Sequence, residues 1–434
     1  MADINTGTST DTAPPDPAHP DTGHAGDRGT ATRTSFGSRV RRAAPPVLVY
    51  LAIRLVGVVV LAVMAASHDT SLLDRLTAWD GQWYLGIAEH GYAGQSARSV
   101  GPDGQPYPDA PFAFFPLYPA AMSIVATFGI PLDIAGLVVS TLAGVAAVPA
   151  VMRLARHAQP RPHTGPRHHT GPQGDAAPHV RPRPDVDPHR VGLLLVALWA
   201  GAPMSGVLSM VYTEATFLVL AAWALVGVLD RRWLLAGTCA LTAGLVRPSA
   251  AVLIAVVVAA ALHAAWTRRG GWPAALAAGT APLGLLGWWL TVHIATGHTW
   301  QAIERHGWGV SWDWGADTLA WISAAFAAEA HPYHLVGATV TVGAAALVVV
   351  LTVQRPPWPL TAYAAGVVAL AVGSGGLAIT TPRLLLAAAP VLMLPIATGL
   401  AGRHRGTALA VTGAVVIAGC WFSAYALTAW QYAI

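Results

Sequence analysis

Residues 45–66 read PPVLVYLAIRLVGVVVLAVMAA, and after a short polar segment residues 79–92 read WDGQWYLGIAEHGY. The first stretch is an apolar run long enough to cross about 30 Å of hydrocarbon as a helix. The second places an acidic residue, Asp80, among aromatic residues soon after that run. In a membrane protein this position lies at the boundary between lipid and water. Asp80 could cap a helix there, lie solvated in a loop, or be held in place for chemistry.

The rest of the chain is also strongly apolar. Of its 434 residues 54% are hydrophobic and 11% are charged, and the mean hydropathy is +0.50. Soluble domains carry about 25% charged residues, so much of this chain needs lipid around it. The formal net charge of +4 is small and scattered, which speaks against nucleic-acid binding. Cys239 and Cys420 lie in apolar runs without disulfide or metal spacing, as buried small residues do.

Composition divides the chain into two polar segments and two membrane regions. Residues 1–44 and 153–190 are rich in Pro, Gly and polar residues, and we expect both to be disordered. Arginines in both segments place them, with the N-terminus, in the cytoplasm by the positive-inside rule. Histidines in the second segment could bind a metal, although an unstructured loop explains them more simply. Residues 45–152 and 191–434 then form the membrane bundle.

The apolar runs predict an all-α polytopic bundle of about eleven transmembrane helices. The expected spans are 45–66, 132–152, 191–210, 212–229, 233–247, 249–265, 273–293, 335–353, 359–379, 384–400 and 407–427. Short arginine-rich turns between them fit cytoplasmic ends. The apolar piece at 116–130 must then be a partly inserted or interfacial helix, because a full crossing would move the arginine-rich segment 153–190 outside.

This topology places four ionisable residues, Asp80, Glu214, Arg247 and Arg383, on the extracytoplasmic side. Ionisable residues at the centre of a span cost about 2.5–3.5 kcal/mol, so those near spans are candidates for function. An outer arginine runs against the usual bias, and its guanidinium group suits a phosphate. Snorkelling to the headgroups is the simpler explanation for either arginine alone. For Glu214, a helix start capped by Thr213 is a sufficient structural explanation.

Aromatic residues gather on the same side. If the stretch after Asp80 is helical, Asp80, Trp83 and Tyr84 share one face, which is typical of an amphipathic helix at headgroup level. The outer loop 294–334 adds many tryptophans together with His306. Aromatic faces bind sugars and also mark membrane interfaces, and the sequence does not separate the two. The sequence has no nucleotide loop, zinc motif or nucleophile elbow, so a membrane enzyme of this kind would need a lipid-carried donor.

Several motifs in order resemble the PIG-V family of mannosyltransferases, which are integral-membrane glycosyltransferases of the GT-C superfamily. These motifs are the stretch at 79–92, AFFPLYP at 113–119, YTEATF at 212–217, Arg247-Pro248 and Pro382-Arg383. The resemblance implies a GT-C-type bundle in the cell membrane. It also implies transfer of a sugar, mannose in that family, from a polyprenyl-phosphate donor on the outer face. The acceptor would be a lipid, a glycan or a protein.

The resemblance also implies roles for individual residues. In the GT-C fold the acidic residue of the first outer loop is catalytic, which makes Asp80 the general base of an inverting reaction. Arg383 and Arg247 would bind the donor phosphate. The candidate substrate-positioning residues are Glu214, Tyr84, Trp83, Tyr118 and His306. No metal ligands are predicted. Some GT-C enzymes use a divalent cation, but Asp80 is followed by Gly81 and not by a second acid, which makes one less expected here.

Two other classes of protein share these features. A transporter or flippase of lipid-linked sugars would need the aromatics and the arginines but no general base, and the inverted repeats often seen in transporters are not found in the sequence. A non-enzymatic scaffold of a glycan-assembly complex would also be embedded in membrane lipids. Clustering of Asp80, Glu214, Arg247 and Arg383 in one outer cavity would favour an enzyme over a scaffold.

Overall fold

The structure is a computed structural model that describes residues 36–101, 104–158, 186–327, 331–376 and 378–430. The predictions of disorder and of a histidine tract fall largely outside the described residues. Residues from Ala43 onward form one compact unit, and the description below concerns this unit.

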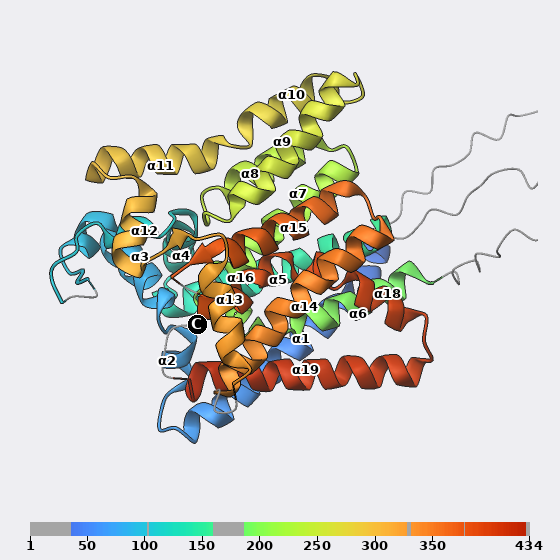
Figure 1. The fold of residues 1–434 in the computed structure, drawn as a ribbon, viewed down its shortest axis with the longest axis horizontal. Coiled ribbons are helices and arrows are strands. Elements are labelled where there is room, and N and C mark those ends of the chain that lie inside the picture. The colour runs from blue at the N-terminus through green and yellow to red at the C-terminus, as the bar shows by residue number, and fades with distance from the viewer. Residues whose placement is uncertain (1–35, 102–103, 159–185, 328–330, 377, 431–434) are drawn as a thin grey trace, which may run out of the picture. The chain divides into compact units, whose positions relative to one another are not determined.

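Nearly all of the described chain is helical (Figure 1). The α-helices are α1(Phe36–Ala66), α2(Leu72–Leu76), α3(Asp80–Ser96), α4(Leu117–Ala126), α5(Leu132–His157), α6(Pro188–Ala200), α7(Glu214–Leu229), α8(Trp233–Ala243), α9(Ala250–Trp266), α10(Gly271–Thr280), α11(Leu283–Thr296), α12(Trp300–Trp308), α13(Ala316–Ala325), α14(Pro332–Gln354), α15(Trp358–Gly373), α16(Thr381–Leu384), α17(Ala389–Leu392), α18(Leu394–Ala401) and α19(Arg405–Thr428). Short 3₁₀ turns are η1(Ala110–Ala113), η2(Ser205–Ser209), η3(Ala378–Thr380) and η4(Leu385–Ala388). The strands β1(Ser311–Trp312) and β2(Ser374–Gly375) pair in antiparallel fashion.

Within the described residues, five helical segments are long and apolar enough to cross a membrane. They are Ala44–Ala66, Leu132–His157, Gly271–Thr296, Pro332–Gln354 and Arg405–Thr428. The pair Ala378–Leu392 and Leu394–Ala401, bent by 45°, makes a sixth span of this kind if the two parts are one. Backbone groups in lipid must be satisfied internally, and helices achieve this. The predicted all-α, multi-pass class of membrane protein is therefore confirmed.

The other predicted spans correspond to shorter apolar helices. These are α6, α7, α8, α9 and α15, with lengths of 11 to 17 residues. Because about 20 helical residues are needed to cross the hydrocarbon, the figure of about eleven complete crossings stays a prediction. The piece predicted at 116–130 forms α4, whose 10 residues are too few for a full crossing, as the topology requires.

The aromatic segment predicted as an outer loop at 294–334 is largely built of regular structure. It contains α12, β1 and α13, because local side chains satisfy the helix ends. The Thr299 hydroxyl accepts the backbone N–H of Ala302 at 3.2 Å and so starts α12. The Asp313 carboxylate accepts the backbone N–H of Gly315 at 2.8 Å just before α13. These caps turn an aromatic, turn-rich sequence into ordered structure.

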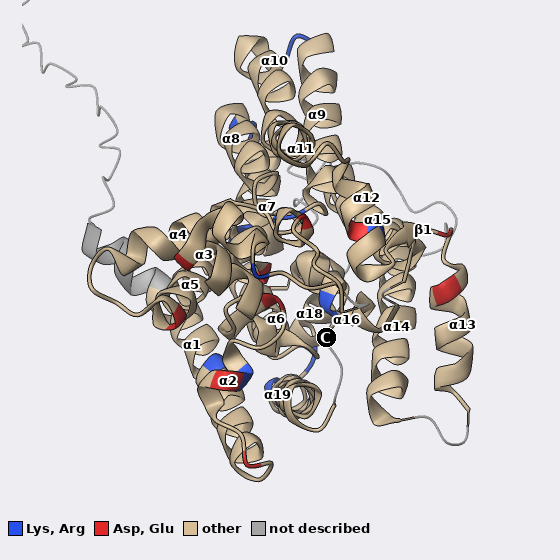
Figure 2. Ribbon diagram, turned by 90° about the vertical axis from the view of Figure 1, so that its left-hand side faces the viewer, with Lys and Arg blue, Asp and Glu red and all other residues tan. Residues whose placement is uncertain are grey.

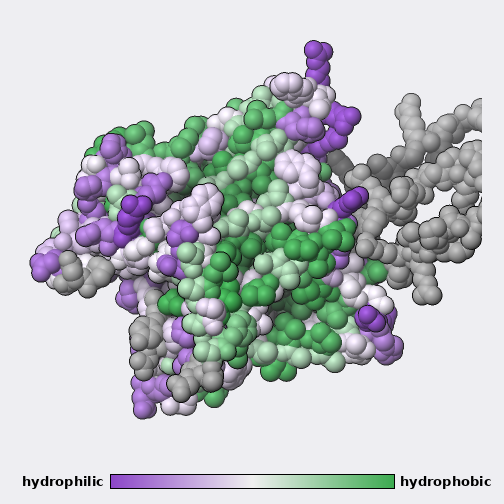
Figure 3. All heavy atoms as spheres, viewed as in Figure 1, coloured by the Kyte–Doolittle hydropathy of each residue, from purple (hydrophilic) through white to green (hydrophobic). Residues whose placement is uncertain are grey.

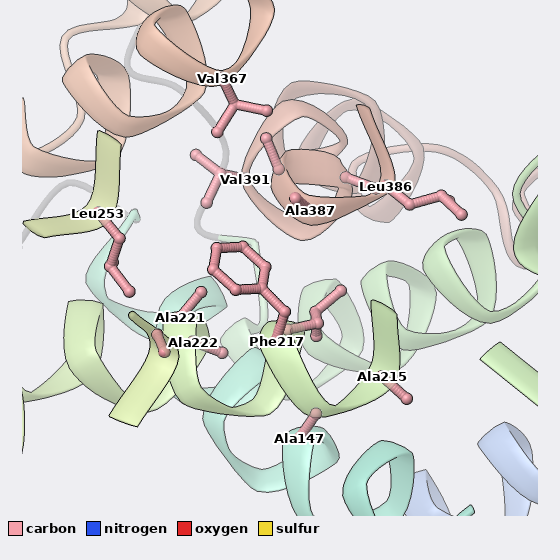
Figure 4. Close-up of a cluster of buried hydrophobic side chains, with 14 of the residues drawn as sticks. Ala147, Ala215, Phe217, Ala221, Ala222, Leu253, Val367, Leu386, Ala387 and Val391 are labelled. Carbon is pink, nitrogen blue, oxygen red and sulfur yellow. The ribbon is translucent and has the colours of Figure 1, made fainter. Parts of the chain in front are cut away.

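The core is built around α7, which packs against α5, α8 and α9. Figure 4 shows Phe217 of α7 lying among Leu253 of α9, Val367 of α15 and Val391 of α17. Alanines along α7 let these neighbours approach closely, since they add little side-chain volume. The first turn of α7, which contains Glu214, is therefore held inside the bundle.

The outer surface of the unit is largely apolar. Charged segments are sparse along the ribbons in Figure 2, and Figure 3 shows hydrophobic surface over the region of α14 and α19. Large apolar side chains remain exposed there, including Val349 and Val353 on α14 and Leu409 and Ile417 on α19. Such a surface is stable only against lipid or another apolar partner.

Candidate active site

Asp80 is the first residue of α3, and its carboxylate is used in an ion pair. The N-cap position belongs to Trp79, and Oδ2 of Asp80 lies 2.9 Å from Nη1 of Arg383. The backbone N–H of Asp80 donates to the hydroxyl oxygen of Tyr212 at 3.3 Å. Solvent reaches 28% of the Asp80 side chain. The helix cap and the solvated loop, which the sequence allowed for Asp80, are therefore wrong.

The backbone before Asp80 is strained. Trp79 has φ 51° and ψ −112°, and a positive φ is rare for a bulky residue. Strain of this kind costs about 1–3 kcal/mol and persists where the surroundings hold it. One support is Gln82, whose side-chain amide donates to the carbonyl oxygen of Thr77 at 2.9 Å across the turn. The turn between α2 and α3 therefore fixes the position of the Asp80 backbone, from which the carboxylate extends.

Glu214 is buried between two arginines. Its side chain is 3% exposed, and Oε1 lies 3.2 Å from Nη1 of Arg247 and 3.3 Å from Nε of Arg383. The other oxygen, Oε2, is buried without a hydrogen-bond partner. The Thr213 side chain makes no capping hydrogen bond at the start of α7. Helix capping by Thr213 therefore does not explain the presence of Glu214 at this position. A carboxylate this deeply buried needs opposite charges beside it, and the two guanidinium groups supply them.

Both arginines are buried as well, with side chains 9% and 13% exposed for Arg247 and Arg383. Snorkelling to the headgroups is therefore excluded for this pair. Arg247 lies over the ring of Phe217 at 5.7 Å from its centroid, and Arg383 lies over the ring of Tyr212 at 5.3 Å. These cation–π contacts hold each guanidinium group in a fixed plane.

The structure thus brings four sequence-distant residues into one chain of charges, which we call the charge chain. Its order is Asp80, Arg383, Glu214 and Arg247. A hollow of about 610 Å³ lies on another side of α3 and is lined in part by Gln82, but its lining contains none of the four charged residues. The clustering expected for an enzyme is present, while a single outer cavity around it stays a prediction.

Two predicted positioning residues, Trp83 and Tyr84, lie on α3 close behind Asp80. Tyr84 is buried, packs edge-on against Phe114 with ring centroids 5.3 Å apart, and hydrogen-bonds the side chain of Thr213. Trp83 stacks on Phe114 with centroids 5.2 Å apart. These contacts tie the start of α3 to η1 and to the start of α7, and so support the position of Asp80.

Tyr118 and His306 differ from the other predicted site residues. The Tyr118 hydroxyl donates to the carbonyl oxygen of Gly136 at 2.9 Å and also lies 2.8 Å from the hydroxyl of Ser140, so its polar atom serves the fold. His306 is on the exposed side of α12 and lies edge-on to Tyr107, with ring centroids 4.7 Å apart. The structure does not bring these two residues into the charge chain.

Glu304 on α12 is a further candidate, which the sequence offered only as a polar group of the aromatic loop 294–334 without a role. Burial raises the pKa of Glu304 to about 8; the negative charge of Asp80 acts in the same direction, and Arg383 opposes it. Tyr107 helps to hold α12 in place by donating its hydroxyl to the carbonyl oxygen of Ile303 at 2.9 Å. Because we predicted a loop over these residues, the sequence did not indicate where the Glu304 side chain lies. The capping signal of Thr299 ahead of α12 could have revealed it.

The part of the chain described by the structure contains no group of three or more His, Cys, Asp and Glu side chains placed to hold a metal ion. In the charge chain, both Asp80 and Glu214 already contact arginines. These residues do not form a ligand set, and whether a divalent cation takes part stays a prediction. Cys239 and Cys420 are free. Cys420 is buried, as predicted, whereas Cys239 is only half-buried.

The fold and site together define a multi-pass all-α membrane protein with a buried chain of charges. No family model and no curated protein matches the chain, so the resemblance to the PIG-V family is not confirmed. Among solved structures, the chain is similar to the crystal structure of the Archaeoglobus fulgidus oligosaccharyltransferase in the apo form, at 11% identity and a TM-score of 0.44. The match covers 88% of this chain and 56% of that one, so this chain spans little more than half of its length.

Glu304 makes the stability of the protein depend on pH. Below about pH 4.5 the carboxyl group is protonated in both states; from there to about pH 8 the unfolded state is ionised and the folded state is not. The unfolded state then binds fewer protons, so stability falls as the pH rises through this window. We expect Glu304→Gln to remove this part of the pH dependence, as measured by thermal unfolding at a series of pH values. Identical pH profiles for the wild type and the variant would contradict the assignment.

Proposed function

We propose that the protein is a GT-C-type membrane glycosyltransferase. In this proposal it transfers a sugar, mannose by resemblance, from a polyprenyl-phosphate donor to an acceptor hydroxyl with inversion. In this proposal the reaction takes place on the extracytoplasmic face, which the distribution of arginines in the sequence supports. The observation that supports the proposal most is the direct contact between Asp80 and Arg383 within the charge chain. A proton acceptor thereby lies beside a cation suited to phosphate.

The contact suggests how the two halves of the reaction are linked. Asp80 takes the proton of the acceptor hydroxyl as that oxygen attacks the anomeric carbon. The bond between the sugar and the phosphate breaks, and its electron pair stays on the phosphate oxygen. Once protonated, Asp80 no longer neutralises Arg383, whose guanidinium group lies 2.9 Å away. The positive charge of Arg383 then stabilises the departing phosphate in the same step.

Glu214 and Arg247 prepare this arrangement. Glu214 contacts Nε of Arg383, which fixes the orientation of the guanidinium fork without using Nη1, the atom that faces Asp80. Arg247 supplies a second positive charge beside the Glu214 carboxylate. It is also the second candidate for binding the donor phosphate. Fixed charges in a site with little water stabilise a developing charge more strongly than the same charges in water.

Burial of the charge chain speaks against the scaffold alternative. A scaffold needs no buried ions, and burying several charges costs free energy that a purely structural role could avoid with apolar residues. No specific observation favours the transporter or flippase, since that class needs no proton acceptor beside Arg383. An assay that follows both sugar transfer and movement of the donor across the membrane separates the transferase from the transporter or flippase.

The test is a transfer assay with labelled polyprenyl-phosphate-mannose in membranes that contain the overexpressed protein. We expect release of polyprenyl phosphate and label in a new product. Arg383→Gln should lower the rate by about 10²–10³, because it removes the charge that stabilises the leaving phosphate. Arg383→Lys should retain part of the activity, since it keeps the charge but loses the fork.

Arg269→Gln is the matched control, because Arg269 is an exposed arginine beyond the end of α9. It should leave the transfer rate unchanged. If wild-type membranes release no more polyprenyl phosphate than membranes without the protein, the proposed reaction is wrong. If Arg383→Gln and Arg269→Gln behave alike, the role of Arg383 is wrong.

A further inference from the structure

Two tryptophans on the outer segment after α12 form an exposed aromatic corner, which we call the Trp312–Trp314 corner. The side chains are 50% and 85% exposed. Their ring centroids lie 5.5 Å apart and the ring planes meet at 75°. Large aromatic side chains normally bury much of their surface, so an exposed pair at a fixed angle calls for an explanation.

The corner is built rigidly. Trp312 lies in β1, and its ring is pressed against Gly373, where a Cβ atom would have no room. The Asp313 carboxylate accepts the backbone N–H of Asp317 at 2.8 Å, and the Asp317 carboxylate accepts that of Gly376 at 2.8 Å. The two carboxylates therefore tie β1, α13 and β2 together around the rings.

The backbone of the corner is also strained. Trp314 has φ 61° and is followed by Gly315 with φ 88°. A tryptophan in the left-handed region costs free energy, and such strain is found mainly where a side chain must be presented in one direction. An anchor among lipid headgroups needs no fixed ring angle, because amphipathic rings are accommodated there in many orientations. The geometry points to a ligand with a defined shape.

The corner is linked through the backbone to α12 and, by way of β2, to α16. On one side β1 follows α12, whose Glu304 feels the charge of Asp80. On the other side β2 leads through η3 into α16, which carries Arg383. Figure 2 shows β1 beside the upper end of α13, at the right-hand edge of the view. The corner is therefore connected along the chain to α16, which carries one member of the charge chain.

We propose that the Trp312–Trp314 corner is a stacking platform for carbohydrate, and that it binds the sugar part of the acceptor. The apolar C–H faces of a sugar ring stack on aromatic rings, and its hydroxyl groups can donate to carboxylates. Asp313 and Asp317 supply carboxylates beside the rings, and these would repel anionic headgroups. The acceptor is then a glycan or a glycolipid. This inference rests on the proposed function, because it names the acceptor of that reaction.

The first test measures binding without turnover. The full-length protein, labelled with fluorotryptophan and placed in nanodiscs, is titrated with mannotriose and followed by fluorine NMR. The resonances lost in Trp312→Phe and Trp314→Phe identify the two rings. We expect these two signals to shift saturably with the sugar, while the signal of Trp266, an exposed tryptophan 90% accessible on α9, does not. Broadening of the two signals by spin-labelled lipid headgroups, without any response to sugar, would overturn the proposal in favour of a membrane anchor.

The second test uses the transfer reaction with a soluble manno-oligosaccharide acceptor. Trp314→Ala should raise the KM for the acceptor about tenfold, with kcat and the KM for the donor nearly unchanged. Trp266→Ala is the matched control and should change none of them. An unchanged acceptor KM in Trp314→Ala would refute the platform while the transferase proposal survives. Conversely, sugar binding at the corner without any transfer would refute the transferase proposal while the platform survives.

Discussion

Asp80→Asn is expected to lower kcat for sugar transfer by about 10²–10⁴, the range that a positioned general base contributes. Asparagine has nearly the same shape as aspartate but cannot take up the acceptor proton. The substitution also leaves Arg383 in contact with Glu214, so the fold should persist. The measurement is single-turnover transfer from labelled polyprenyl-phosphate-mannose, with protein amount and thermal unfolding checked in the same membranes.

Glu89→Gln is the matched control for this prediction. Glu89 lies on the same helix but is 62% exposed and contacts only its neighbour His90 among the ion pairs described. It should leave transfer unchanged. Unchanged transfer by Asp80→Asn at normal protein amount would refute the role of Asp80. If that variant still moved donor across the membrane while Arg383→Ala did not, the transporter or flippase would be the better explanation.

Glu214→Gln is expected to destabilise the protein by about 3–5 kcal/mol, the cost of removing one partner from a buried ion pair. The glutamine would leave the guanidinium groups of Arg247 and Arg383 buried without the carboxylate that they share. The repulsion between them would add to the cost of burial. The change should appear as a lowered midpoint of thermal or denaturant unfolding in detergent.

Asp230→Asn provides the comparison, because Asp230 lies just past the other end of α7 and pairs with His157 at 2.8 Å near the surface. Its loss should cost about 1 kcal/mol or less. Combining Glu214→Gln with Arg247→Gln should recover part of the stability, which a double-mutant cycle measures. If Glu214→Gln were no more harmful than Asp230→Asn, the charge chain would not be a buried ion-pair network.

The membrane class could be predicted because it depends on composition and local periodicity. Residues 45–66 are apolar apart from Arg54, and such a run in lipid can satisfy its backbone only as a helix. The helices within the segment 294–334 were not predicted because they depend on single side chains near their starts, Thr299 and Asp313, within a segment of low periodicity. The number of spans does not follow from the sequence for a related reason, since short helices such as α8 pack one face against other helices and need not cross lipid alone.

The sequence by itself determined that lipid surrounds this protein and that a few ionisable residues lie near the ends of its apolar runs. Hydrophobic runs act locally and additively, so they can be recognised one at a time. Only the tertiary structure decided that Asp80, Arg383, Glu214 and Arg247 form one chain of contacts and that burial raises the pKa of Glu304 on α12. Ion pairs between distant positions depend on distances of a few ångströms. Those distances are set by how α3, α7, α12 and α16 pack together.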